Sequence, residues 1–144
     1  MSNAIVKIDF DVSDEAIVLA RKIMTEKETD MRQQLGDELL DELADLAQID
    51  IVKLKISDEK QYHKKRAGKV AMRQYGYYKP GSKYIYINNR TAVQGKVLAG
   101  KTFLNTLVHE WMHHYDCCKL GLNSIHTKGF YSRLNCLYKA LLCE

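Results

Sequence analysis

The chain contains 144 residues, of which 46% are hydrophobic and 28% are charged, and its net charge is +4. This composition is typical of a soluble globular protein with one domain, and it excludes an intrinsically disordered chain. No apolar run approaches the ~20 residues of a membrane span and no secretory signal is recognisable, so we expect a cytoplasmic protein that contacts no membrane.

Two helices are predicted before residue 50. Ser13 precedes two acidic residues, a combination typical of a helix N-terminus, and apolar residues then recur at helical spacing as far as Met24. The pattern is interrupted at residues 29–30 and resumes over residues 31–48. The acidic side chains of the second helix lie largely off its apolar stripe, so we interpret them as a solvated face.

A small sheet is predicted in the middle of the chain. Residues 52–56 alternate between apolar and charged side chains, which is typical of a strand with one buried face. Two runs rich in β-branched and aromatic residues, 70–78 and 83–88, flank a Pro-Gly turn within residues 79–82. These two runs therefore predict a β-hairpin.

The pattern H-E-x-x-H occurs at residues 109–113, within a predicted helix over residues 102–121. Residues four apart lie on one face of a helix, so the imidazoles of His109 and His113 can bind one Zn²⁺ while Glu110 stands beside it. Apolar residues at helical spacing would hold the opposite face in a core. This arrangement is that of a hydrolytic site in outline.

The segment after this helix supplies a third candidate ligand. We place the N-cap of the helix at Thr102 and its stop at Gly121. A catalytic zinc needs three protein ligands and one open position, and His126 is the best third candidate. Phe130 and three leucines then follow at intervals of four, three and four, which predicts a closing helix with Thr127 as its N-cap.

The order H-E-x-x-H, short loop and H-x-x-x-F at the start of another helix resembles the SprT-like zinc metallopeptidases, the family that includes Spartan. The positions that match are His109, Glu110, His113, His126 and Phe130. The predicted order of N-terminal helices, small sheet with a hairpin, motif helix and closing helix makes one α+β domain over residues 1–144. It is close to the order that the resemblance implies, which is a zincin-like domain with its motif core at residues 102–142.

The expected function is zinc-dependent hydrolysis of peptide bonds by a metalloendopeptidase that holds one Zn²⁺ per chain. The metal lowers the pKa of its water toward ~7 and polarises a substrate carbonyl. Glu110 then takes the proton of that water and delivers it to the leaving amine. Residues 70–88 are the expected binding edge for an extended protein or peptide substrate, and the resemblance extends this to DNA-associated proteins.

Three further residues are candidates for supporting this chemistry. Asp116, one turn beyond His113, could coordinate the metal or orient an imidazole, and we favour the second role. Tyr131 and Arg133 on the closing helix are candidates for stabilising the developing oxyanion.

The basic residues raise a second hypothesis. Residues 1–59 carry 15 acidic and 7 basic side chains, whereas residues 60–109 carry 11 basic and no acidic ones. Such segregation favours contact with DNA or another polyanion through residues 60–101. The central candidates are Lys64, Lys65, Arg66 and Lys69.

Two alternatives to the peptidase follow from these patterns. The first is a nucleic-acid-binding module whose zinc is structural or whose peptidase site is inactive. The second is a purely structural α+β protein whose histidines are incidental, which predicts no bound metal. The physiological substrate and the oligomeric state are not indicated by the sequence.

Overall fold

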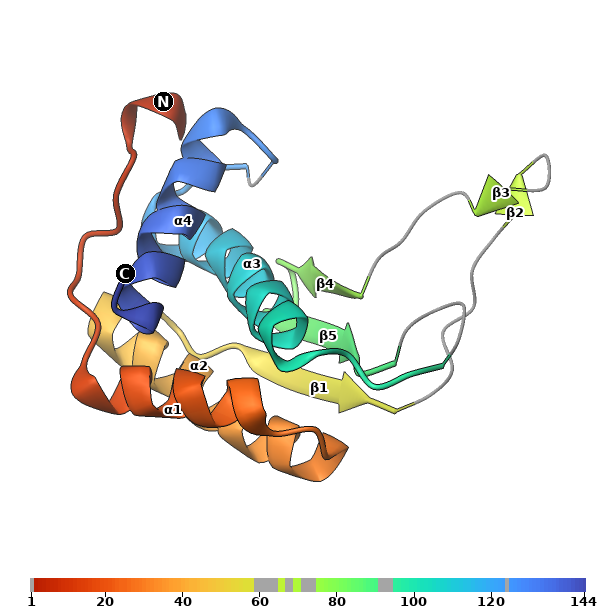
Figure 1. The fold of residues 1–144 in the computed structure, drawn as a ribbon. Coiled ribbons are helices and arrows are strands. Elements are labelled where there is room, and N and C mark those ends of the chain that lie inside the picture. The colour runs from red at the N-terminus through yellow and green to blue at the C-terminus, as the bar shows by residue number, and fades with distance from the viewer. Residues whose placement is uncertain (1, 59–64, 67–68, 71–74, 91–94, 124) are drawn as a thin grey trace.

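The computed structural model of the protein describes residues 2–58, 65–66, 69–70, 75–90, 95–123 and 125–144. It shows a single α+β domain, which confirms the predicted fold class (Figure 1). In chain order the elements are a 3₁₀ turn η1 (Ser2–Ala4), α1 (Asp14–Thr25), α2 (Thr29–Ala47), β1 (Lys53–Ser57), β2 (Lys65–Arg66), β3 (Lys69–Val70), β4 (Gly76–Lys79), β5 (Tyr84–Asn88), α3 (Gly100–Lys119) and α4 (Lys128–Leu142).

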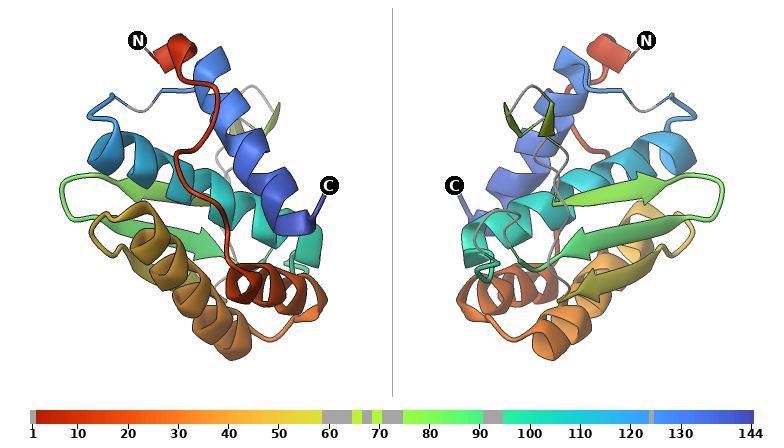
Figure 2. Two further views of the ribbon diagram at one scale, coloured as in Figure 1. Left: turned by 90° about the vertical axis from the view of Figure 1, so that its left-hand side faces the viewer. Right: turned by 90° about the vertical axis from the view of Figure 1, so that its right-hand side faces the viewer.

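The domain has a three-stranded sheet with the four α-helices on one side of it. The strand order is β1-β5-β4, with β1 parallel and β4 antiparallel to β5. In the right-hand view of Figure 2 the three strands face the viewer and the α-helices lie behind them. α2 packs on β1, α3 packs on β4 and β5, and α1 and α4 pack on α3 and on each other.

Alternation along the strands decides which side chains meet the helices. Successive side chains of a strand point to opposite faces of a sheet. On β5, Ile85 and Ile87 are fully buried, and they lie in register with Leu54 and Ile56 of β1. These four side chains form the sheet side of the hydrophobic core. The intervening residues point away from the helices.

Two predicted helix starts are confirmed by their capping hydrogen bonds. The Ser13 hydroxyl accepts a 3.1 Å hydrogen bond from the backbone N–H of Ala16. The Thr127 hydroxyl accepts a 3.1 Å hydrogen bond from the backbone N–H of Phe130. Each cap satisfies one of the N–H groups that have no partner within a helix.

The predicted N-cap of the motif helix is wrong, whereas its predicted stop is confirmed. α3 begins at Gly100 after an N-cap at Ala99 that has no side-chain hydrogen bond, so Thr102 lies inside the helix. A Cβ on Gly100 would lie 1.8 Å from the carbonyl oxygen of Met24 at the end of α1. This close approach fixes where the helix begins. At the other end, Gly121 has φ +63°, the left-handed conformation of a helix stop.

Two other predicted boundaries need correction. The break between α1 and α2 lies at residues 26–28 rather than 29–30, because the carboxylate of Glu26 accepts from the N–H groups of Lys27 and Glu28 and α2 then begins at Thr29. The first arm of the predicted hairpin is shorter than residues 70–78. β4 begins only at Gly76, and Val70 belongs to β3, where it pairs with Lys65 of β2. Residues 71–74 lie outside the described residues.

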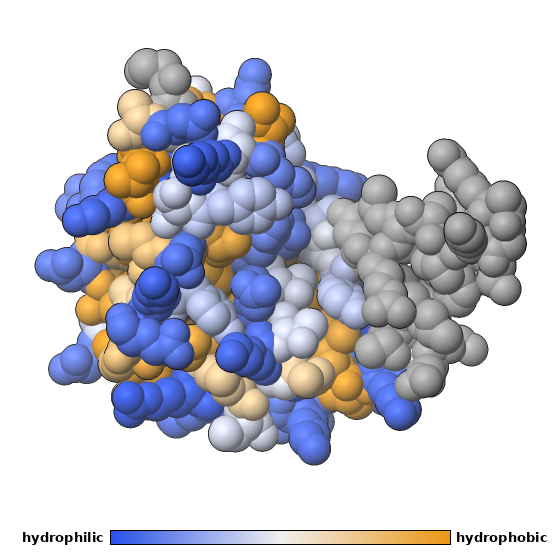
Figure 3. All heavy atoms as spheres, turned by 45° about the horizontal axis from the view of Figure 1, so that its top comes forward, coloured by the Kyte–Doolittle hydropathy of each residue, from blue (hydrophilic) through white to orange (hydrophobic). Residues whose placement is uncertain are grey.

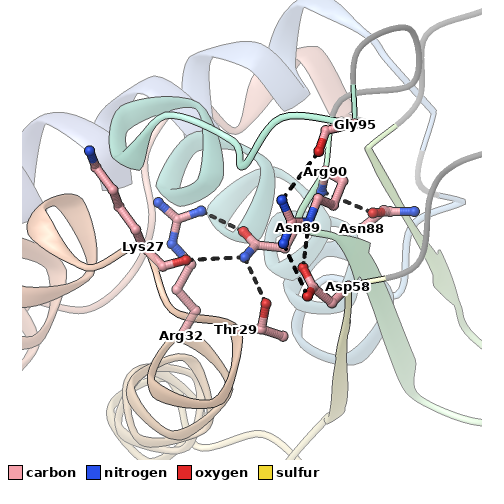
Figure 4. A network of polar contacts seen from close by, with 8 residues as sticks. All are labelled: Lys27, Thr29, Arg32, Asp58, Asn88, Asn89, Arg90 and Gly95. Atoms are coloured by element: carbon pink, nitrogen blue, oxygen red, sulfur yellow. Dashed lines mark hydrogen bonds and ion pairs between the residues drawn. The ribbon is translucent and has the colours of Figure 1, made fainter.

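A buried polar network joins α2 to the end of β5 (Figure 4). The side-chain amide of Asn89, which is fully buried, donates to the Lys27 carbonyl and the Thr29 hydroxyl. Its oxygen accepts a hydrogen bond from Arg32, whose guanidinium also lies 4.6 Å from the centre of the Phe103 ring on α3. One buried cation therefore ties α2, β5 and α3 together.

None of the helices that the structure describes is both long enough and apolar enough to cross a membrane. On the face shown in Figure 3, hydrophobic residues are scattered among hydrophilic ones. The large hydrophobic side chains that are exposed in the described part of the chain are Val6, Val18, Met31, Ile51, Ile125 and Tyr131.

Candidate metal centre

α3 presents the H-E-x-x-H residues at the edge of the core. Trp111 and Met112 are fully buried and hold the helix against the rest of the domain. His109 and His113 lie one turn apart on the opposite, partly exposed face. Glu110 is 9% exposed, so its carboxylate lies at the boundary between core and cleft.

The loop after α3 brings His126 to the same point. Its Nε2 lies 3.1 Å from Nε2 of His109 and 3.2 Å from Nε2 of His113. All three residues offer a ligand atom within 4.8 Å of the others. Two nitrogens that bind one tetrahedral zinc at 2.0–2.1 Å lie about 3.3–3.4 Å apart. The distances from His126 to the other two nitrogens are therefore close to the spacing of ligands around one zinc ion.

Hydrogen bonding among the imidazoles explains this convergence only in part. Nε2 of His126 carries either one hydrogen or one lone pair while the ring is neutral, so that single hydrogen or lone pair would have to serve both neighbouring nitrogens. A cation at the centre would interact favourably with all three lone pairs at once. The donor set is also one that zinc prefers.

Phe130 forms the floor beneath the three imidazoles. Its ring is fully buried and stacks on the His113 ring, with centroids 4.5 Å apart and planes at 22°. It meets the His109 and His126 rings edge-on at 5.1 Å and 5.5 Å. Because Phe130 is held by the N-cap of α4, this helix fixes the ring orientations of residues on two other segments.

Burial favours the neutral form of His109 and His113. Desolvation, together with the charges of His109 and His126, lowers the pKa of His113 to about 4. Burial, followed by the charge of His126, also lowers the pKa of His109. A neutral imidazole is the form that binds a metal. Burial has the opposite effect on the carboxylic acid of Glu110, whose pKa it raises to about 7.

A cleft of 810 Å³ opens over the three histidines. One wall is the β4 strand with the turn that follows it, and the other is the exposed face of α3. The lining residues are Tyr75, Gly76, Tyr77, Tyr78, Pro80, Asn105, Thr106, His109, Glu110, His113, Cys117, Asn123, Ile125 and His126.

Sequence reasoning missed Asn105 and Cys117 as lining residues. They lie four residues before His109 and four residues after His113, so all four share one helical face. The same spacing rule that identifies the histidines could have found them.

The β4 wall is attached to α3 through His114, which is fully buried. Its Nε2 lies 2.7 Å from the backbone carbonyl oxygen of Asp50, so this nitrogen carries the hydrogen and donates it. Its Nδ1 then accepts a 2.9 Å hydrogen bond from the Tyr78 hydroxyl. His114 therefore positions the cleft wall and stays outside the group of candidate ligands.

The three supporting candidates lie in different surroundings. Asp116 and Arg133 form a buried ion pair between α3 and α4, with Oδ1 2.9 Å from Nε and Oδ2 2.6 Å from Nη2. Neither residue lines the cleft. Tyr131 is 49% exposed, and its ring centroid lies 5.8 Å from that of His126 and 6.4 Å from that of His109. Tyr131 therefore stands beside the histidines.

The residues expected to contact a polyanion are only partly described. Lys64 lies outside the described residues. Lys65 and Arg66 form β2 and Lys69 begins β3, and the two strands pair with each other. Contact between this segment and a polyanion stays a prediction.

Comparisons with known proteins do not identify the chain. No family model, no curated protein and no solved structure matches it. The observations that bear on function are therefore the geometry of the candidate metal centre and the five residues that carry the resemblance to SprT-like peptidases.

Proposed function

We propose that the protein is a zinc-dependent metalloendopeptidase. The observation that carries this proposal is the convergence of three histidine ligand atoms within 4.8 Å of one another, next to the carboxylate of Glu110 and at the base of an open cleft. The H-E-x-x-H spacing and the resemblance to SprT-like peptidases support the same activity.

The number of ligands favours a catalytic over a structural zinc. Structural zinc sites are closed by four protein ligands, whereas catalytic sites use three and leave a position open. Among the residues that the structure describes, the group that could hold a metal contains the three histidines and no fourth residue. Glu110 and Cys117 line the same cleft and lie outside this group.

Each residue has a separate task in the proposed reaction. Bound zinc would supply Lewis acidity, polarising the scissile carbonyl and lowering the pKa of a water molecule. Glu110 takes the proton from that water and passes it to the leaving amine. Phe130 holds the imidazoles in place through its stacking and edge contacts.

The substrate we infer is an extended segment of protein. Within the described part of the chain, β4 pairs only with β5, and its residues line the cleft beside the histidines. An edge strand presents unpaired N–H and C=O groups that can add a substrate strand. Tyr131 stands within reach of the same space and is our candidate for a hydrogen bond to the developing oxyanion.

The proposal is tested by zinc content and peptidase activity measured on the same samples. We expect wild type to hold about one zinc per chain and to cleave fluorescently quenched casein. His126→Ala should lose both properties. Glu110→Gln should keep its zinc and lose about 10²–10⁴-fold in rate, because only the proton transfer is removed.

The matched control is Glu38→Gln, which makes the same chemical change at an exposed position of α2. This variant should behave as wild type in both measurements. A Glu110→Gln protein that cleaves at the wild-type rate would overturn the proposed mechanism. Absence of zinc after reconstitution of the wild type would overturn the proposed function.

A further inference from the structure

The side of the sheet that faces away from the helices carries an ordered set of lysines and tyrosines. We call this set the outer sheet face, and its members are Lys53, Lys55, Tyr77, Lys79, Tyr84 and Tyr86. No described helix packs over this side of the sheet, and the right-hand view of Figure 2 shows the strands from this side.

Strand register arranges these side chains in two rows. In the first row, Tyr84 on the central strand lies between Lys53 on β1 and Lys79 on β4. In the second row, Tyr86 lies between Lys55 and Tyr77. The three lysines are exposed and the three tyrosines are partly exposed. Each row therefore presents an aromatic ring with at least one cation beside it.

The cations of the outer sheet face are not neutralised by neighbouring acids. Among the described residues, Lys53, Lys55 and Lys79 form no ion pair. The nearby carboxylates of Asp50 and Asp58 are instead paired with Lys83 and Arg90 respectively. The lysines thus leave an uncompensated positive potential across the tyrosines.

Two of the three tyrosine rings pack against each other. The Tyr77 and Tyr86 rings are stacked, with centroids 5.2 Å apart and planes at 14°. The Lys79 ammonium lies 5.4 Å from the centre of the Tyr77 ring. Burial, followed by the neighbouring phenols of Tyr77 and Tyr86, raises the pKa of Tyr84.

We propose that the outer sheet face binds single-stranded nucleic acid, with bases stacked on Tyr84 and Tyr86 and phosphates held by Lys53, Lys55 and Lys79. Aromatic platforms flanked by cations are the general means of holding single strands without reading their sequence. The base faces of a duplex are covered by stacking within the duplex, so duplex DNA could contact only the lysines. This proposal does not depend on the peptidase activity, because none of these five residues lines the cleft.

Cross-strand tyrosines also stabilise a sheet on their own account, so the sheet needs no ligand to explain their presence. The lysines are what distinguish a ligand-binding face from a purely structural one. Lysine is a weak strand former, and the register places Lys53 and Lys79 on either side of Tyr84 with no acidic partner among the described residues. A polyanion would supply counter-charges to these lysines, whereas an apolar partner would bury them unpaired.

The test is binding of a fluorescein-labelled oligothymidylate of about 12 nucleotides, a length within the range that single-strand-binding folds cover. Fluorescence anisotropy is measured against salt concentration, with and without a chelator, and with duplex DNA and polyglutamate as competitors. Circular dichroism and urea unfolding check that each variant is folded.

We expect the double variant Tyr84→Ala/Tyr86→Ala to bind at least about tenfold more weakly, the loss of one or more stacked bases. Tyr84→Phe/Tyr86→Phe retains the rings and should bind as wild type. Replacing the three face lysines by alanine should reduce the slope of log Kd against log salt by about 2, since each phosphate contact contributes ~0.7.

The control for charge is the triple variant at exposed lysines elsewhere in the chain, Lys22→Ala/Lys27→Ala/Lys139→Ala. It lowers the net charge equally and should keep the wild-type slope. The proposal is overturned if wild type does not bind the oligonucleotide at low salt, if the alanine variants bind as well as wild type, or if duplex or polyglutamate competes as well as single strands.

Discussion

Replacing Asp116 by alanine will lower the free energy of unfolding by about 3–5 kcal/mol. The carboxylate receives hydrogen bonds of 2.9 and 2.6 Å from Arg133, and neither side chain is more than 1% exposed. Truncation leaves the guanidinium buried without its counter-charge. Arg133 also donates from Nη1 to the Ile5 carbonyl at 2.7 Å, but a neutral carbonyl does not replace the counter-charge of a carboxylate.

Urea denaturation measures this effect directly, and thermal unfolding should shift by about 10–20 °C for a domain of this size. The double variant Asp116→Leu/Arg133→Met removes both charges and should recover much of the stability. A loss below ~1 kcal/mol in Asp116→Ala would refute the reasoning. Loss of zinc without loss of stability would instead identify Asp116 as a metal ligand, the role that its helical position also allowed.

Three further predictions concern the helix ends and the metal. Gly100→Ala should destabilise the domain by about 1–3 kcal/mol in urea unfolding despite alanine's higher helix propensity, because its Cβ would overlap the Met24 carbonyl. Thr127→Ala should cost ~1 kcal/mol by the same assay and Thr127→Ser almost nothing, since serine also caps the N-terminus of α4. With free zinc at a hundredfold excess over its Kd, removing the zinc with a chelator should lower the free energy of unfolding of wild type by about 2.7 kcal/mol. The stability of His109→Ala/His113→Ala should be the same with and without chelator, as followed by thermal unfolding.

The parts of the candidate metal centre that follow from local geometry could be predicted from the sequence. His109 and His113 share a face because helix periodicity is a property of the backbone itself. The cap at Thr127 depends only on the four consecutive residues 127–130 and was predicted correctly. The position of His126 beside the other two histidines could not be predicted from local geometry, because a loop of this length can point in many directions. Its placement in the sequence hypothesis came from the three-ligand requirement and the resemblance.

The parts that depend on packing between distant segments could not be predicted. Asp116 was a candidate for the metal site because it shares a helical face with His113. No sequence pattern near Asp116 indicates that it forms an ion pair with Arg133. The start of α3 depends on how closely the end of α1 approaches Gly100. The outer sheet face depends on the register that pairs Lys53 with Tyr84, two residues far apart in the chain.

Strand alternation separates the two proposed activities within one small sheet. On β4, Gly76 and Tyr78 point toward α3, whereas Lys79 points to the outer sheet face. A protein chain along the open edge of β4 and a nucleic acid across the outer face would therefore lie on adjacent sides of the same strand. Tyr84 and Tyr86 belong to the central strand and do not line the cleft. Tyr86 does stack on Tyr77, which lines the cleft, so the Tyr84 ring is the one whose removal leaves the cleft lining and its contacts unchanged. Removing a histidine likewise affects the metal and not the outer sheet face, so each proposal can fail without the other.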